Sequence, residues 1–156
     1  MLVKHDRDPL GKGRPIVRQR FNVASGARVL YLGDEIDTCL HETQAFAMAS
    51  SIAIVPVIVK LHPVLDLRDP HVRKGFGMTL ADIRLNFRTV PMGSPPTDTQ
   101  ELGEALASSL NVDGLLYESI ARRGSACLAV FETCLAALGS SLEVQDPANA
   151  LFDRLP

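Results

Sequence analysis

The apolar segments of this sequence are short, rich in β-forming residues and irregularly mixed with segments of helical periodicity. Five of them are typical of strands: 28–33, 52–59, 64–67, 115–117 and 127–131. Helical patterns lie between them: 34–50, 79–87 and 97–110. This irregular order favours an α+β fold over a doubly wound parallel sheet. A length of 156 residues matches one ordinary domain.

The helical pattern after the first strand positions a carboxylate. Asp34 is the predicted N-cap, and apolar or small residues then recur at helical spacing from Ile36 to Ser50. At 100° per residue, Glu42 lies on the flank of that stripe. A carboxylate that lines a cleft would occupy this position, and so would a solvated glutamate.

Charge and composition exclude several classes of function. Sixteen Lys and Arg against eighteen Asp and Glu give a formal charge of −2, which provides no basic footprint for nucleic acid or an anionic membrane. There is no apolar run long enough to span a bilayer, and the first eight residues are too charged for a signal-peptide core, so we expect a cytoplasmic protein. The three cysteines form no close pair and the four histidines have no ligand spacing, so we expect neither a disulfide framework nor a metal.

Three residues of complementary chemistry recur at equal intervals near the start of the chain. Arg20, Tyr31 and Glu42 are separated by two gaps of eleven residues, and the apolar run 113–119 later delivers Ser119. An arginine fork binds phosphate oxygens, an aromatic ring stacks on a planar ligand, and a carboxylate stabilises a cation. The ordinary alternatives are a surface arginine, a core tyrosine, a solvated glutamate and a serine that closes a strand.

In order and spacing these motifs resemble the RES domain. Arg20-Phe21-Asn22 resembles the family motif G-R-[WF]-N, with Gln19 in place of the glycine. Val29-Leu30-Tyr31-Leu32 resembles V-x-Y-[LA], and Glu42 follows on the next helix. Tyr117-Glu118-Ser119 resembles Y-P-S, with glutamate in place of proline. The resemblance implies one RES domain over residues 1–156, with an ADP-ribosyltransferase-like split β-sheet core and flanking helices.

The resemblance also implies a site that attacks NAD+ without a metal. Glu42, Ser119 and Arg20 are the expected catalytic residues, and Tyr31 and Arg20 are expected to bind the dinucleotide. The family's first arginine is missing: Lys4 and His5 are predicted to replace it, and Arg7 does so if the register is shifted.

The function implied by the resemblance is that of a bacterial type II toxin. It would cleave the nicotinamide–ribose bond of NAD+, transfer ADP-ribose to a protein and arrest growth. The alternatives are a glycohydrolase or phosphorylase that depletes NAD+, and a catalytically inactive binding module. The expected partner is an Xre-like helix-turn-helix antitoxin that blocks the active site.

Overall fold

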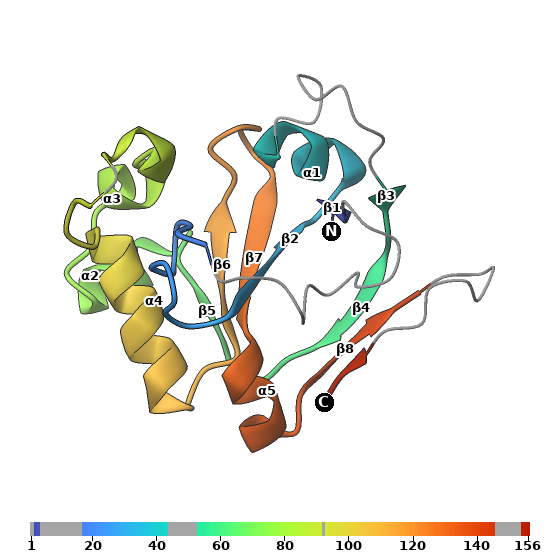
Figure 1. Ribbon diagram of the computed structural model, residues 1–156. Helices are drawn as coiled ribbons and strands as arrows, with labels where there is room; N and C mark the ends of the chain where they lie inside the picture. Colours follow the sequence, from blue (N-terminus) through green and yellow to red (C-terminus); the bar gives the residue numbers. More distant parts are fainter. Residues whose placement is uncertain (1, 4–16, 44–52, 92, 146–153) are drawn as a thin grey trace.

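A four-stranded mixed sheet forms the centre of the protein (Figure 1). The computed structural model describes residues 2–3, 17–43, 53–91, 93–145 and 154–156. The sheet has the order β2-β7-β6-β5, in which only β5 and β6 run parallel. Its strands are β2 (Val29–Gly33), β5 (Val64–Asp66), β6 (Gly114–Glu118) and β7 (Ala126–Phe131). This mixture of antiparallel and parallel pairing with separate helices confirms the α+β class.

A smaller sheet covers one face of the central sheet. It has the order β4-β8-β9, with strands Val57–Lys60, Ser141–Val144 and Arg154–Leu155. Leu32 and Val130 of the central sheet share a buried cluster with Leu142 and Val144 of the small sheet. A separate two-stranded pair joins β1 (Leu2–Val3) to β3 (Ala53–Ile54).

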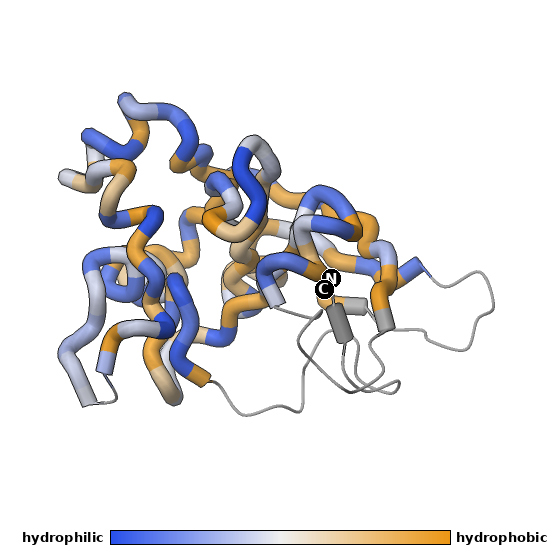
Figure 2. The backbone as a smooth tube through the Cα atoms, turned by 90° about the horizontal axis from the view of Figure 1, so that it is seen from above, coloured by the Kyte–Doolittle hydropathy of each residue, from blue (hydrophilic) through white to orange (hydrophobic). Residues whose placement is uncertain are grey.

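Helices cover the opposite face of the central sheet. These are α2 (Pro70–Gly75), α3 (Leu80–Arg84) and α4 (Asp98–Ser109), with a 3₁₀ turn η2 (Phe87–Thr89) after α3. The main core lies here and includes Phe21, Ile83 and Tyr117. Figure 2 shows hydrophobic segments in the interior of the molecule, with hydrophilic residues interspersed along the surrounding turns and helices. The described residues form two further helices, α1 (Ile36–Glu42) and α5 (Glu132–Leu138).

Helix α4 holds the segment that contains the first motif, Arg20-Phe21-Asn22. It begins with a capping box in which Thr97 and Gln100 bond each other's main chain. Gln100 also donates to the carbonyl of Gln19 at 2.7 Å. A side chain at Gly103 would place Cβ 1.9 Å from the carbonyl oxygen of Phe21, so only glycine permits this close approach. The motif segment is therefore packed directly against the helix backbone.

Most of the predicted strands are confirmed, with one instructive break. The run 52–59 is split at Val55 and Pro56 into β3 and β4, which pair with different sheets. Proline cannot donate to a ladder, so the strand changes partner at this point.

One predicted cap is wrong. Glu35, not Asp34, is the N-cap of α1, since the Asp34 carboxylate instead accepts hydrogen bonds from Ala126 N and Thr38 Oγ1, both at 2.8 Å. The described part of this helix ends at Glu42, and residues 44–50 of the predicted helix lie outside the described residues. Among the helices described, none is long and apolar enough to cross a membrane.

Candidate active site

The clearest polar contact of the predicted site joins the end of α1 to the end of β6. Ser119 Oγ lies 2.6 Å from Glu42 Oε1, and it accepts a hydrogen bond from Arg122 N at 3.0 Å. Because the hydroxyl oxygen is the acceptor for the amide, its hydrogen is directed at the carboxylate. Ser119 is buried and Glu42 is half-buried, so the serine fixes a carboxylate that still reaches the surface.

The turn after β6 docks α1 at its other end as well. The Arg122 guanidinium pairs with Glu35, and it also donates to Thr38 Oγ1 at 3.4 Å. Glu118 occupies the place of the family proline, and its side chain pairs with Arg84 at 2.7 Å. The turn still closes, because Ser119 N donates to the carbonyl of Ser125 at 2.9 Å.

Two buried titratable side chains lie beneath this pair. Tyr117 and Cys127 face each other in the register of β6 and β7, and Ser119 lies on the same face of β6 as Tyr117. Burial and the nearby negative charge of Glu42 raise the pKa of the Cys127 thiol to about 12. Burial, with a smaller contribution from Glu42, also raises the pKa of Tyr117 well above its ordinary value. Both groups are neutral at physiological pH and form an uncharged floor under the carboxylate.

Arg20 is buried beside that floor rather than displayed on the surface. Its exposed fraction is 2 %, and Nη1 donates to the carbonyls of Ile83 and Leu85 at 2.5 and 2.9 Å. The guanidinium carbon lies 5.6 Å from the ring centre of Phe87 and 5.7 Å from that of Tyr117. Nη2 is buried and has no hydrogen-bond partner within the described residues. A buried cationic donor without a partner is costly, and an acceptor atom of a ligand would satisfy it.

Tyr31 supports the Arg20 segment through its hydroxyl group. The hydroxyl oxygen accepts from Phe21 N at 2.9 Å, and its hydrogen is donated to Asn22 Oδ1 at 3.0 Å. Burial raises the pKa of Tyr31 well above its ordinary value of 10.0. The ring is half-buried and packs beside the main core. Tyr31 therefore holds the first motif in place, whichever ligand its ring contacts.

Arg88 lies beside the predicted site, and the sequence does not indicate it. Its Nη2 donates to the main-chain carbonyl of Glu42 at 2.6 Å, and its guanidinium lies 5.5 Å from the ring centre of Phe87. The Phe87 ring thus contacts both Arg20 and Arg88. No pattern in the sequence indicates Arg88, because it belongs to a short 3₁₀ turn with no motif of its own.

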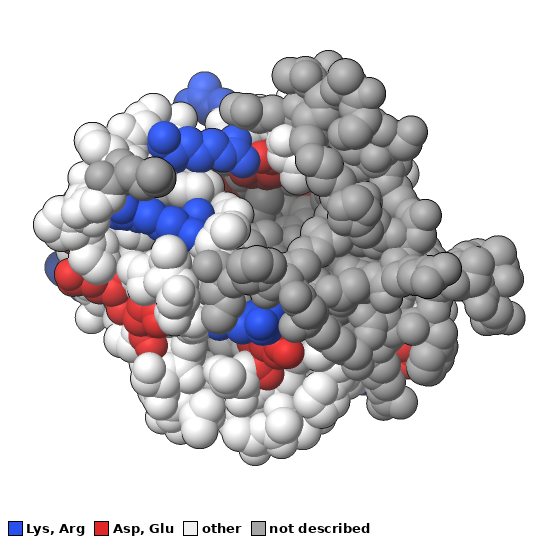
Figure 3. All heavy atoms as spheres, in the orientation of Figure 1, with Lys and Arg blue, Asp and Glu red and all other residues white. Residues whose placement is uncertain are grey.

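The structure connects the described residues of the predicted site through a chain of contacts. Figure 3 shows basic side chains gathered around a depression that contains an acidic group. Glu42 and Ser119 touch, Arg20 adjoins Tyr117, and Tyr31 contacts the Arg20 segment from the sheet side. Lys4, His5 and Arg7 lie outside the described residues. The described part of the chain has no group of three or more His, Cys, Asp or Glu side chains arranged to hold a metal ion.

Comparison with known proteins supports the family resemblance. Residues 3–151 match the family described as the RES domain. No curated protein and no solved structure gives a significant match. The match spans nearly the whole chain, so the protein belongs to the RES-domain family, whose members are NAD-related toxins of toxin–antitoxin systems.

Proposed function

We propose that this RES-domain protein binds NAD+, cleaves its nicotinamide–ribose bond and transfers the ADP-ribose unit to a bacterial protein, which arrests growth. The contact between Glu42 and Ser119 carries the proposal. Bond cleavage releases neutral nicotinamide with the bonding electron pair and leaves an oxocarbenium-like ribose. A fixed carboxylate at the edge of a neutral floor suits the stabilisation of that cation.

Glu42 has the features that this role requires. Oε1 is held by Ser119, whereas Oε2 makes no hydrogen bond within the described residues. On this proposal Ser119 fixes one oxygen, and the other faces the ribose or accepts the proton of the incoming nucleophile. Ser119 acts as a positioning residue that fixes the carboxylate.

The two arginines near Glu42 suit the diphosphate. Arg20 offers Nη2, which has no partner among the described residues, and Arg88 offers the donors that do not bind the Glu42 carbonyl. Guanidinium groups bind phosphate oxygens strongly in partly dehydrated sites. On this proposal Tyr31 contributes its half-buried ring to the nicotinamide end, and Lys4 with His5 completes the site from the N-terminal segment.

The acceptor separates this proposal from its rivals. Purified protein is incubated with NAD+ labelled in the adenylate moiety, in the presence of bacterial lysate. We expect labelled protein bands that accumulate with free nicotinamide. Free ADP-ribose, or its 1-phosphate, without a labelled band would instead indicate a glycohydrolase or a phosphorylase. No NAD+ binding by calorimetry and no growth defect on expression would indicate an inactive binding module.

The proposed partner is an Xre-like helix-turn-helix antitoxin that covers the hollow around Glu42. Its binding should compete with NAD+ because both need access to the same carboxylate. Co-expression followed by an NAD+ titration of the purified complex tests this point. Unchanged NAD+ affinity in the complex would place the antitoxin elsewhere.

A further inference from the structure

A pocket of about 250 Å³ lies next to the candidate active site. Its walls are partly apolar and partly charged: Leu67, Arg68, Arg73, Leu80, Ile83, Glu118, Gly124 and Ser125. Two of them connect it to the site already described. The Ile83 carbonyl accepts from Arg20, and the Ser125 carbonyl accepts from Ser119 N. A ligand in this pocket would therefore lie one residue layer away from the reacting groups.

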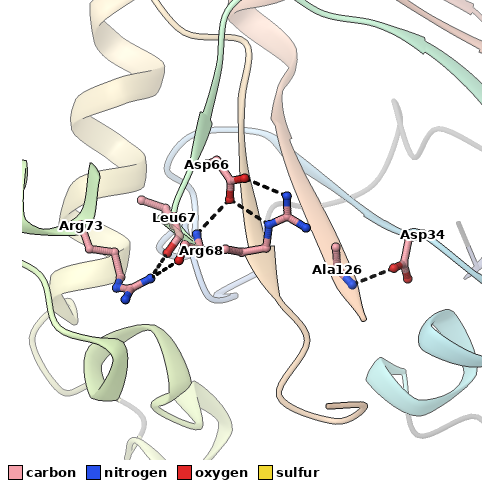
Figure 4. Close-up of polar contacts among 6 residues, drawn as sticks. All are labelled: Asp34, Asp66, Leu67, Arg68, Arg73 and Ala126. Atoms are coloured by element: carbon pink, nitrogen blue, oxygen red, sulfur yellow. Dashed lines mark hydrogen bonds and ion pairs between the residues drawn. The ribbon is translucent and has the colours of Figure 1, made fainter. Parts of the chain in front are cut away.

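Arg73 provides the binding edge of this pocket. It is half-buried on α2, and Nη1 donates to the carbonyls of Leu67 and Arg68 at 2.6 and 2.8 Å (Figure 4). These two bonds fix the plane of the guanidinium. Nε and Nη2 make no hydrogen bond to any described residue, and Arg73 has no ion pair among them. Nε–H and Nη2–H together form the side-on fork that binds an oxyanion through two parallel bonds.

The neighbouring cations are already neutralised. Arg68 makes a bidentate pair with Asp66 at 2.9 and 2.7 Å, drawn in Figure 4, and Arg84 pairs with Glu118 at 2.7 Å. Arg73 therefore contributes the unpaired charge at the pocket, which fits one negative charge. One carboxylate neutralises this charge, whereas a doubly charged phosphate would leave a negative charge without a partner in the pocket. Leu67 and Ile83 offer contacts to an aliphatic stem.

We propose that this pocket is a carboxylate subsite that holds an acidic side chain of the protein acceptor. The assignment of the occupant to the acceptor rests on the proposed function, whereas the carboxylate chemistry rests on the pocket itself. Docking of an acidic residue here would place the neighbouring stretch of the acceptor beside Glu42 and Ser119. Selection of the acceptor would then depend on a residue that takes no part in NAD+ cleavage.

The binding test uses the full chain and observes the arginine Nε–Hε groups by ¹H–¹⁵N NMR. The probes are N-acetylglutamate N-methylamide, its neutral glutamine counterpart, inorganic phosphate and NAD+. We expect the glutamate probe to shift the Arg73 signal saturably and the glutamine probe to leave it in place. No response to the glutamate probe would overturn the proposal. A stronger response to phosphate, or a direct response to NAD+, would assign the pocket to phosphate or to the dinucleotide and overturn it too.

Variants separate the fork from the charge. Arg73→Lys keeps a cation that reaches the two carbonyls but has no side-on fork. We expect this variant to bind the glutamate probe at least tenfold more weakly. Its binding is measured from the shifts of the main-chain amide signals of the pocket. Lys74→Gln removes one exposed charge from the same helix without touching the pocket, and we expect unchanged binding. A loss in Lys74→Gln equal to the loss in Arg73→Lys would show that binding does not depend on the Arg73 fork, and would reject the subsite. Arg73→Gln repeats the test without the charge. If the Arg73→Gln variant does not fold, Arg73→Lys alone decides the question.

The functional test compares two activities of the same variant. Arg73→Lys should lower labelling of lysate proteins at least tenfold and leave nicotinamide release without acceptor unchanged. An equal fall in both activities would contradict an acceptor subsite. If the wild type releases no nicotinamide at all, the proposed function fails, while the binding of the glutamate probe still decides the carboxylate subsite.

Discussion

The contact between Glu42 and Ser119 makes a quantitative prediction about coupled variants. Glu42→Gln removes the charge but nearly preserves the shape, and electrostatic stabilisation of this kind is worth about 3–4 kcal/mol, or roughly 10²–10³ in turnover. Ser119→Ala removes a hydrogen bond to a charged group, worth about 1.5–3 kcal/mol, or roughly 10- to 100-fold. Since the serine acts through the carboxylate, the double variant should be about as slow as Glu42→Gln alone.

The assay is the release of nicotinamide by purified protein, measured together with circular dichroism and urea unfolding. Ser119→Ala also deprives Arg122 N of its acceptor, so its folding stability must be measured beside its turnover. Glu101→Gln is the matched control, because Glu101 is an exposed glutamate on α4 and is not part of the site. Its turnover should equal that of the wild type.

Two results would refute the reasoning. Undiminished turnover of a folded Glu42→Gln variant would remove the carboxylate from the mechanism. Losses that multiply in the double variant would show that Ser119 acts independently of Glu42, for example by contacting the substrate itself. Both outcomes are distinguishable from misfolding by the unfolding midpoints.

Three further predictions follow from the surroundings of the site. Arg20→Lys should weaken NAD+ binding and lower the free energy of unfolding by about 1–3 kcal/mol, since an ammonium lacks the planar face and leaves buried acceptors poorly satisfied; calorimetry and urea unfolding measure both. Gly103→Ala should lower the free energy of unfolding by about 1–3 kcal/mol or more, because its Cβ would meet the Phe21 carbonyl. Urea unfolding measures this loss. An unchanged free energy of unfolding with native-like NAD+ turnover would contradict the assigned role of α4. The hydrogen bond from Arg84 lowers the pKa of Glu118 below its ordinary value of 4.5, so this pair stabilises the fold above that pH and the contribution is lost as the pH falls through the lowered pKa. Arg84→Gln should therefore reduce the acid-induced fall in the unfolding midpoint, and an unchanged pH dependence would reject the contribution.

The sequence predicts the strands of this fold better than their partners. Alternating and β-branched runs identify β2, β6 and β7, because these strands carry the core on both faces of the central sheet. In the second sheet, the sequence predicts β4 but not β8. Residues 141–144 form β8 by pairing with β4, and that pairing depends on contacts between segments about eighty residues apart. Helix α5 was also missed, since its seven residues directly continue β7 without a loop.

The candidate site could be predicted in its motif residues but not in its supports. Glu42 and Ser119 were expected to act together, and the structure brings them into contact. The sequence does not predict the roles of Arg88 and Arg73, because each side chain is oriented by a main-chain carbonyl that only the folded chain provides. Asp34 shows the converse error: a side chain suited to a helix cap was drawn instead to the main chain of β7.

The equal spacing of Arg20, Tyr31 and Glu42 has no single geometric origin. Arg20 lies in a loop on α4, Tyr31 in the second strand and Glu42 at the end of a helix, so the two gaps of eleven residues cross different elements. Their connection is instead mechanical. Tyr31 ties down the main chain at Phe21 and the side chain of Asn22, and the first motif thereby presents Arg20 to Phe87. The Phe87 ring also contacts Arg88, which donates to the Glu42 carbonyl. Loss of the Tyr31 hydrogen bonds would therefore change the position of Glu42 through these packed groups, without a direct contact between Tyr31 and Glu42.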